Sequence, residues 1–216
     1  KDVGVKLVSA IEDWDPAAFG IGKKDARRMD RYTQFAMAAA AELMEKAGDL
    51  GEVDPYRVGI LVSSGIGGLM TTLNEHVKYM EKGPERLSVF TIPMMISNMA
   101  AGQLAIKYGF KGDNFAVVSA CATGAHSVGE GFRKIKDGYL DLCIVGGSEA
   151  PICEYAVGGF ANMGALTFST DCDRLSIPFD KERSGFVMGE GAGLLLLEEY
   201  ERARARGANI LAEGVG

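Results

Sequence analysis

The sequence predicts an α/β fold in which a mainly parallel sheet lies between helices, and two patterns lead to this prediction. Short apolar runs that suit buried strands recur at 58–62, 115–119, 141–145 and 194–197. Between these runs, apolar residues return every three or four positions, as they do on the buried face of a helix. Strands that alternate with helices favour a parallel sheet that is covered on both faces.

Each predicted element follows from its own local pattern. The helix over 31–47 has one apolar face and ends at Gly48, and a basic loop at 23–28 leads into it. The patterns predict, in chain order, a strand over 3–10, a helix over 31–47, a strand over 57–63, helices over 69–79 and 97–108, a strand that ends just before Cys121, a helix over 122–136, strands over 141–145 and 194–197, and a helix over 198–207.

Composition and charge limit the classes of function. The chain has 216 residues, 47% hydrophobic and 24% charged, which is enough for one sizeable globular core. A formal net charge of −6 argues against nucleic acid as the main partner, but it leaves room for an acidic partner that meets a local basic patch. No apolar run approaches the roughly 18 residues of a membrane span, and no signal peptide is visible, so we expect a cytoplasmic protein without membrane contacts.

The cysteines do not have the spacing of a metal site. Cys121, Cys143, Cys153 and Cys172 include no C-x-x-C pair, so the sequence predicts neither a metal nor a cofactor. Most of these cysteines are expected to be buried thiols.

Cys121 nevertheless has the surroundings of a nucleophile. An apolar run ends at Ser119, small residues follow, and a helical pattern begins directly after the cysteine. The free amide groups at a helix start favour negative charge, so a cysteine there is expected to have a useful thiolate fraction near neutral pH. His126 lies five residues further on, an offset of roughly 140° around a helix, which makes it a poor base for Cys121 and favours a structural role. His76 is expected to face solvent.

Two loops and one carboxylate lie near predicted strand ends. The glycine-rich segment 64–68 matches neither G-x-G-x-x-G nor G-x-x-x-x-G-K-[ST], so a tight turn beside a substrate channel is favoured over a phosphate loop. The methionines at 93–96 suit either core packing or an interface or flexible binding wall, and the residues leave both open. Glu149 either belongs to a site or holds a loop through backbone amides, and the second role is the more common one.

Several blocks of sequence carry a resemblance to a known family. The chain resembles the β-ketoacyl-acyl carrier protein synthases of the thiolase-like superfamily, most closely the type II condensing enzyme of bacterial fatty acid synthesis. The blocks that match in order and spacing are R-M-D at 28–30, S-G-I-G-G at 64–68, N-M-A-A-G at 98–102, A-C-A-T-G at 120–124, G-G-S-E at 146–149 and P-F-D-K-E-R at 178–183.

The resemblance implies a fold, a reaction and partners. It implies a thiolase-like layered fold and a condensation in which Cys121 holds an acyl group as a thioester, which then reacts with decarboxylated malonyl-carrier protein. The partners would be acyl and malonyl carrier proteins and a second copy of the chain in a homodimer. Ile66 and Phe160 match positions that line the family's acyl pocket, and Met94 and Met95 match the place where the partner subunit approaches.

The departures from the family are equally specific. Residues 1–216 match only its N-terminal portion, and the family's first strand and helix are expected to be absent, with that strand placed in the middle of the sheet. The family's two further histidines lie in motifs that do not occur here, since His76 and His126 are the only histidines. We therefore expect a fragment that does not catalyse condensation by itself.

Three alternatives remain open. One is a ketosynthase of a polyketide pathway with the same chemistry. The second is a non-catalytic chain-length partner or interaction module with an inert Cys121, although such partners usually lack the cysteine. The third is a thiol hydrolase, which is disfavoured because neither histidine has a credible geometry with Cys121.

Overall fold

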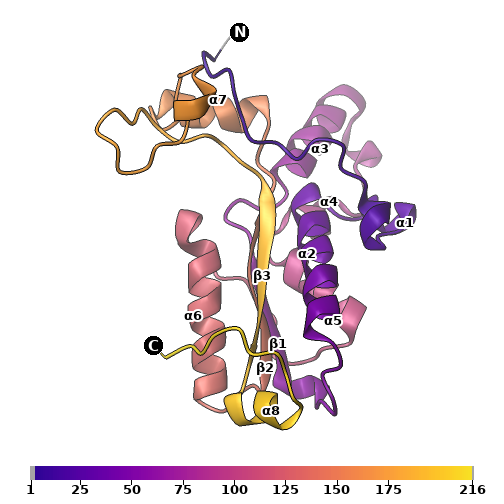
Figure 1. The fold of residues 1–216 in the computed structure, drawn as a ribbon. Coiled ribbons are helices and arrows are strands. Elements are labelled where there is room, and N and C mark those ends of the chain that lie inside the picture. The colour runs from indigo at the N-terminus through magenta and orange to yellow at the C-terminus, as the bar shows by residue number, and fades with distance from the viewer. Residues whose placement is uncertain (1–2, 216) are drawn as a thin grey trace. The chain divides into compact units, whose positions relative to one another are not determined.

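The structure is a computed structural model that describes residues 3–215 (Figure 1). Residues 1, 2 and 216, the ends of the predicted domain, lie outside the described residues. The described chain forms two compact units. The larger unit consists of residues 15–149 and those from 191 onward, and the smaller consists of the residues up to 14 together with 150–190. The chain therefore leaves the larger unit after the end of one strand and returns to it at the start of the next.

A mixed sheet forms the centre of the larger unit. Within the described residues it has three strands, β1 (Val58–Ser63), β2 (Leu142–Glu149) and β3 (Gly191–Glu198), which lie in the order β1-β2-β3. β1 and β2 run parallel, whereas β3 runs antiparallel to β2. The predicted α/β class is confirmed, with the difference that the sheet is mixed rather than mainly parallel.

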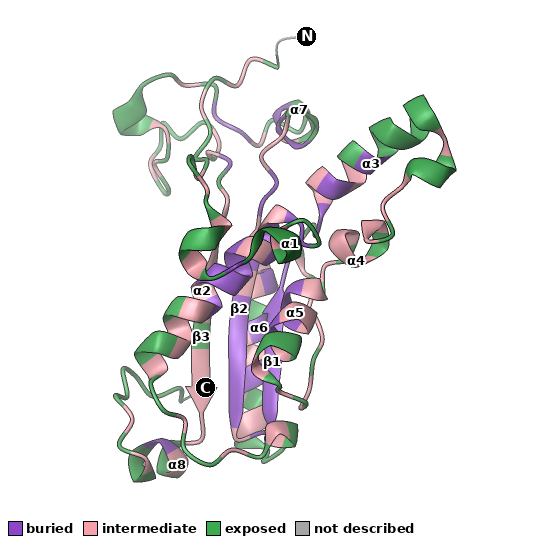
Figure 2. Cartoon of the chain, turned by 90° about the vertical axis from the view of Figure 1, so that its right-hand side faces the viewer, coloured by how far each residue is buried: buried purple, intermediate pink, exposed green. Residues whose placement is uncertain are grey.

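Helices cover both faces of this sheet. α6 (Thr123–Lys136) packs against β1 and β2 on one face, and α2 (Arg31–Ala47) and α5 (Met99–Tyr108) pack on the other (Figure 1). β1 is buried along its whole length and β2 along most of it (Figure 2). Strands that are covered on both faces need apolar residues at successive positions, which is why they appear in the sequence as nearly continuous apolar runs.

Asp30 both begins α2 and connects it to a second helix. Its side chain accepts a hydrogen bond from the Tyr32 backbone amide (3.3 Å) at the start of α2. Its other oxygen accepts from the amide (3.0 Å) and hydroxyl (2.6 Å) of Thr71 in α3 (Leu69–Lys82). The buried Asp30 carboxylate thus accepts hydrogen bonds from the Tyr32 amide and from the amide and hydroxyl of Thr71. The R-M-D block, which ends in Asp30, therefore has a structural role.

Glu198 holds the opposite end of the unit together. Both Arg202 and Arg206 pair with its carboxylate, Arg206 at 2.8 Å. The same guanidinium groups donate to the carbonyl oxygens of Leu50 (2.6 Å) and Asp49 (2.9 Å), just beyond the end of α2. Arginine suits this role because its fixed fork of donors can serve a carboxylate and carbonyls at once.

The remaining elements are short. In the larger unit they are the helices α1 (Lys23–Ala26), α4 (Thr91–Met95) and α8 (Tyr200–Ala205) and the 3₁₀ turns at Pro16–Phe19, Pro55–Arg57, Pro84–Arg86 and Ala120–Ala122. The smaller unit contains α7 (Glu154–Asn162) and a 3₁₀ turn at Cys172–Arg174. Among the described residues, no helix combines the length and the apolar character needed to cross a membrane.

The smaller unit is held by isolated bridges rather than by a sheet. Ser9 pairs with Gly189 and Leu166 with Phe186, and each bridge is parallel. The Phe186 ring also packs edge-on against Phe160 of α7, with ring centroids 5.6 Å apart. Such edge-to-face contacts are a favoured arrangement of aromatic rings.

Three predicted segments differ from the structure. The strand predicted over 3–10 is wrong, because in the described chain this segment makes only the bridge at Ser9. The run 115–119 is extended beside β1 but forms no ladder there, and the bridge between Ile60 and Asn114 marks its start. The predicted loop 93–96 lies mostly in α4, whose first turn tolerates a proline because its amide has no helical partner.

One further expectation is corrected, and another stays a prediction. Within the described residues β1, β2 and β3 are direct hydrogen-bonded neighbours, and the absence of the family's first strand stays a prediction. Most cysteines were expected to be buried, yet only Cys143 is; Cys153 is intermediate, and Cys121 and Cys172 are exposed.

Gly131 provides a test of how closely α6 packs on β2. A Cβ at Gly131 would overlap Cγ1 of Val145, whereas a Cβ at Gly129 in the same helix would meet nothing within 4 Å. We expect Gly131→Ala to lower the free energy of unfolding by about 1–3 kcal/mol through overpacking. Gly129→Ala should raise it by about 0.5–1 kcal/mol, because alanine is the better helix former. Urea denaturation measures both, and equal effects of the two substitutions would contradict the packing.

Candidate active site

Cys121 lies on a strained turn at the beginning of α6. It is the middle residue of the 3₁₀ turn Ala120–Ala122, which runs directly into the helix, and its thiol is exposed. Ala120 has a φ of +50°, a left-handed conformation that residues other than glycine rarely adopt. Strain of this kind persists only where the surrounding structure enforces it, and it gathers at functional sites.

Side chains of α6 hold this turn from the helix side. The Ser119 amide donates to Thr123 Oγ1 (2.9 Å), and the Ser119 hydroxyl is hydrogen-bonded to His126 Nδ1 (2.6 Å). Ser119 thus connects the residue before the turn to the first and second turns of the helix. The predicted structural role of His126 is confirmed, since its ring nitrogen is occupied by Ser119.

Ser63, the last residue of β1, ties the extended segment and α6 to the sheet. Its hydroxyl accepts hydrogen bonds from the Val117 amide (3.0 Å) and the Ser127 hydroxyl (2.9 Å). The single hydroxyl proton of Ser127 has the Thr123 carbonyl oxygen, 3.0 Å away, as its alternative acceptor. All of these groups are buried or half-buried, so the three segments that surround Cys121 share one polar core.

Glu149 holds the turn that follows β1. The parallel register places Ser63 opposite Gly147, so β1 and β2 end at the same edge of the sheet. There, Glu149 accepts hydrogen bonds from the Ser64 hydroxyl (2.6 Å) and the Gly65 amide (2.8 Å). The predicted loop-holding role is confirmed. Burial raises the pKa of Glu149 above its ordinary value, while the hydrogen bonds from Ser64 and Gly65 oppose this rise.

The glycines of segment 64–68 allow close backbone contacts. A Cβ at Gly65 would lie 3.2 Å from the Ala120 carbonyl oxygen, so this turn touches the turn that carries Cys121. A Cβ at Gly67, whose φ is +77°, would lie 2.6 Å from the Met95 carbonyl oxygen. The segment is therefore the tight turn that the sequence favoured, and its glycines are needed for space as well as for conformation.

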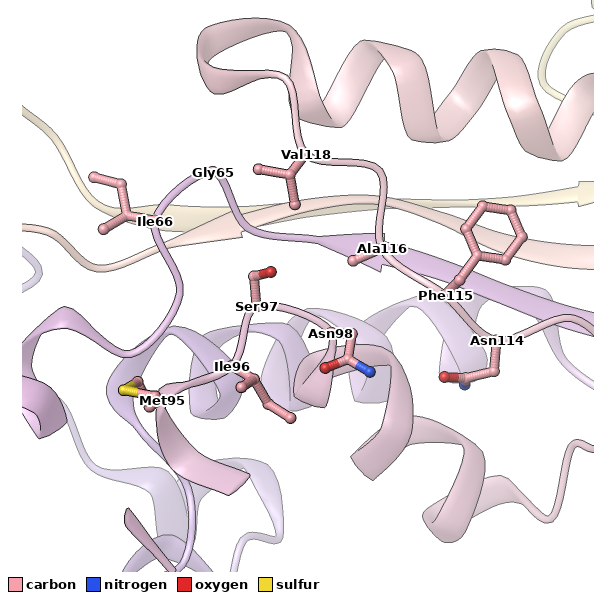
Figure 3. A pocket seen from close by; sticks show the side chains of 10 residues that line it. All are labelled: Gly65, Ile66, Met95, Ile96, Ser97, Asn98, Asn114, Phe115, Ala116 and Val118. Atoms are coloured by element: carbon pink, nitrogen blue, oxygen red, sulfur yellow. The ribbon is translucent and has the colours of Figure 1, made fainter. Parts of the chain in front are cut away.

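An open cavity of about 590 Å³ lies beside the two turns (Figure 3). Its lining combines the glycine turn, the end of α4 with the residues after it, and the extended segment that leads to Cys121. The lining residues are Gly65, Ile66, Met95, Ile96, Ser97, Asn98, Asn114, Phe115, Ala116 and Val118.

The structure separates the predicted site residues into two groups. Ile66 lines the cavity, and Cys121 follows the lining segment by three residues after Val118, although the thiol itself is not part of the lining. Met95 also lines the cavity, which supports the binding-wall interpretation of the methionine loop. Phe160 belongs to the smaller unit, where it packs on Phe186. The roles of Cys121, Ile66 and Phe160 stay predictions.

Several features that shape the site could not be predicted from local sequence patterns. The left-handed conformation of Ala120, the Ser119–His126 hydrogen bond and the link through Ser63 all depend on tertiary contacts. The nearest signal was the run of small residues around Cys121, which showed that space was needed there. Within the described residues, no group of His, Cys, Asp and Glu side chains forms a metal site.

Residues 2–203 match the family described as beta-ketoacyl synthase, N-terminal domain. The chain belongs to this family. It is 50% identical over 197 residues to a 3-oxoacyl-[acyl-carrier-protein] synthase 2 of Staphylococcus aureus, covering 91% of this chain and 49% of that protein. It is 44% identical over 218 residues to the protein of the same name from Synechocystis, covering 100% of this chain and 52% of that protein. The chain thus spans about half the length of these curated relatives.

Solved structures agree with this membership. The crystal structure of a beta-ketoacyl synthase from Burkholderia phymatum has a TM-score of 0.80 to this chain at 28% identity, covering 97% of this chain and 52% of that one. The described fold is therefore that of the thiolase-like ketosynthases, and the family predicted from the sequence blocks is confirmed.

Thiol labelling tests the surroundings of the cysteines of this beta-ketoacyl synthase domain. Cys143 is buried on β2, and burial raises its pKa to about 12. Because the thiolate is the reactive form, iodoacetamide at pH 8 should modify Cys143 at least about 100-fold more slowly than the exposed Cys121 and Cys172. Peptide-level mass spectrometry measures the rates, and urea should abolish the difference. Rapid labelling of Cys143 in the folded protein would contradict its placement in the core.

Proposed function

We propose that residues 1–216 are the N-terminal part of a 3-oxoacyl-[acyl-carrier-protein] synthase that elongates acyl chains in fatty acid synthesis. The observation that carries this proposal is the exposed thiol of Cys121 on a strained turn at the start of α6, beside a cavity, in a chain of the beta-ketoacyl synthase family. The relatives at 44–50% identity are named for this reaction.

In the proposed reaction, Cys121 is the nucleophile. Its thiolate attacks the thioester carbonyl of an acyl carrier protein, and the carrier's thiolate leaves, so that the acyl group becomes a thioester of Cys121. Malonyl-carrier protein then loses carbon dioxide, and the resulting carbanion attacks the acyl-enzyme. The products are a 3-oxoacyl-carrier protein two carbons longer and the free Cys121 thiolate.

The beginning of α6 supplies electrostatic support for both steps. The free amides of a helix start favour the negative charge of the thiolate. The Cys121 amide is proposed as a donor to the oxyanion that forms when the thioester carbonyl is attacked. A rigid turn matters here because such donors stabilise charge only when they are already in position.

The cavity is proposed as the beginning of the acyl site. Ile66, which is 43% exposed, and Met95 form apolar parts of its wall, and methionine adapts to chains of different shape. Phe160 is proposed as an acyl-binding residue, because its position matches one that lines the acyl pocket in the family. Polar groups such as Asn98 and Ser97 lie on the same wall.

An acidic carrier protein is the proposed partner. The exposed residues Lys23, Lys24, Arg27 and Arg28 lie on α1 and directly after it, and they form a basic segment on a chain whose net charge is −6. A local concentration of positive charge attracts an acidic partner even when the whole chain is negative.

The remaining catalytic groups are proposed to lie outside this chain. His126 is hydrogen-bonded to Ser119, and His76 lies on α3, so neither is proposed as an acid or base. Homodimer formation, which the resemblance implies, and a cytoplasmic location, which the sequence predicts, complete the proposal. The full-length protein is therefore the appropriate subject for activity measurements.

Transfer of an acyl group to Cys121 tests this function directly. The full-length protein incubated with acyl-carrier protein should gain the mass of one acyl group, and Cys121→Ala should abolish the gain, because no other thiol has this setting. Cys172→Ala removes the other exposed cysteine and serves as the matched control, which should acylate like the wild type. Acylation that persists in Cys121→Ala would remove Cys121 from its proposed role.

A further inference from the structure

Glu149 uses both carboxylate oxygens on one short turn. One oxygen accepts from the hydroxyl of Ser64 (2.6 Å) and the other from the backbone amide of Gly65 (2.8 Å). Ser64 passes the constraint on, because its hydroxyl also accepts from the amide of Gly67 (2.7 Å). The backbone is thus held on both sides of the residue between these glycines, which is Ile66.

The same turn is enclosed by two neighbouring segments. Gly65 is close to the carbonyl of Ala120 on the side of Cys121, and the positions of Gly67 and Gly68 are close to the carbonyls of Met95 and Met94. The amide of Gly68 also donates to the Met95 carbonyl (2.9 Å). These contacts leave no space for a side chain at any of the three glycines.

Ile66 is the one large side chain of segment 64–68, and this residue belongs to the lining of the cavity. Its own side chain is half exposed, so packing around it does not fix its position. The backbone hydrogen bonds of Glu149 and Ser64 therefore determine where Ile66 lies relative to the turn of Cys121.

We propose that Glu149 is a positioning residue for acyl selection: through Ser64 and Gly65 it fixes Ile66 at the wall of the acyl cavity beside Cys121. This inference rests on the proposed function, because it requires that an acyl chain extends along that wall. Under this proposal the Glu149 of the G-G-S-E block holds a loop and also influences which acyl chains the enzyme accepts.

The chemistry of the carboxylate makes this role specific. Glu149→Gln can keep both hydrogen bonds, because its carbonyl oxygen can accept from the Gly65 amide while its NH₂ group donates to the Ser64 hydroxyl. Glu149→Leu is therefore the informative substitution, since its apolar side chain can accept from neither group. The turn would then lose both of its anchors at residue 149. Burial raises the pKa of Glu149, which agrees with a carboxyl group enclosed by the protein rather than one at the surface.

The experiment compares two substrates in the full-length protein. The ratio of kcat/KM for a short-chain and a long-chain acyl-carrier protein is measured for the wild type, Glu149→Leu, Ile66→Ala and the double variant. We expect each single substitution to change the ratio by at least about 5-fold, because small changes in an apolar pocket alter discrimination by this order. The double variant should match Ile66→Ala, since Glu149 acts through Ile66.

Controls separate positioning from general damage. Glu130→Leu is a matched change on α6, where the Glu130 carboxylate pairs with Arg133 at 2.9 Å, and it should leave the ratio unchanged. Protection of Cys143 from iodoacetamide reports on folding in every variant. If Glu149→Leu fails to fold, Ser64→Ala takes its place, because it removes the hydroxyl that links Glu149 to Gly67.

The outcomes distinguish this inference from the proposed function. If the wild type does not acylate Cys121, the proposed function fails first. If the wild type is active and Ile66→Ala shifts the ratio, but Glu149→Leu and Ser64→Ala stay within twofold of the wild type, the positioning role is overturned. An effect of Glu149→Leu that persists in full in the absence of the Ile66 side chain overturns it as well, as does an unchanged ratio in Ile66→Ala.

Discussion

Backbone contact between two turns, made possible by the missing side chain of Gly65, is the constraint on which the candidate site depends. The turn after β1 and the turn that carries Cys121 meet at the Ala120 carbonyl, 3.2 Å from where a Cβ of Gly65 would lie. At that point neither turn belongs to a strand ladder or an α-helix in the described chain. Each is instead held by a polar side chain of the sheet. The half-buried Glu149 holds the first turn, and the buried Ser63 holds the segment that leads to the second.

The sequence predicts those elements whose burial requires a recognisable pattern of apolar residues within the element itself. β1 and β2 were predictable because burial on both faces requires a continuous apolar run, and α2 because its one buried face repeats with the helical period. The segments 3–10 and 115–119 have similar local patterns, but an apolar or alternating run becomes a strand only when a neighbour pairs with it. Pairing depends on distant residues, and the local pattern does not contain it.

The candidate site divides in the same way. Cys121 was recognisable because a nucleophile needs small neighbours and a helix start, both of which are local features. The sequence places Glu149 at a strand end, where it could belong to a site or hold a loop. Its hydrogen bonds to Ser64 and Gly65 show that it holds the loop. The hydrogen bond between Ser119 and His126 spans seven residues and depends on the turn at Ala120. An alanine in the sequence does not indicate a left-handed conformation, so this hydrogen bond could not be predicted.

The left-handed conformation of Ala120 lowers the stability of the fold but narrows the orientation of the Cys121 thiol. An L-residue other than glycine gives up roughly 1 kcal/mol or more in this conformation. Glycine would relieve that strain, but it would also widen the range of backbone directions open to the next residue. Alanine restricts that range, so the Cys121 thiol has fewer possible orientations. A strained residue at position 120 therefore orients the sulfur atom of Cys121 more narrowly than glycine would. Selection for thermal stability alone would tend to replace this alanine.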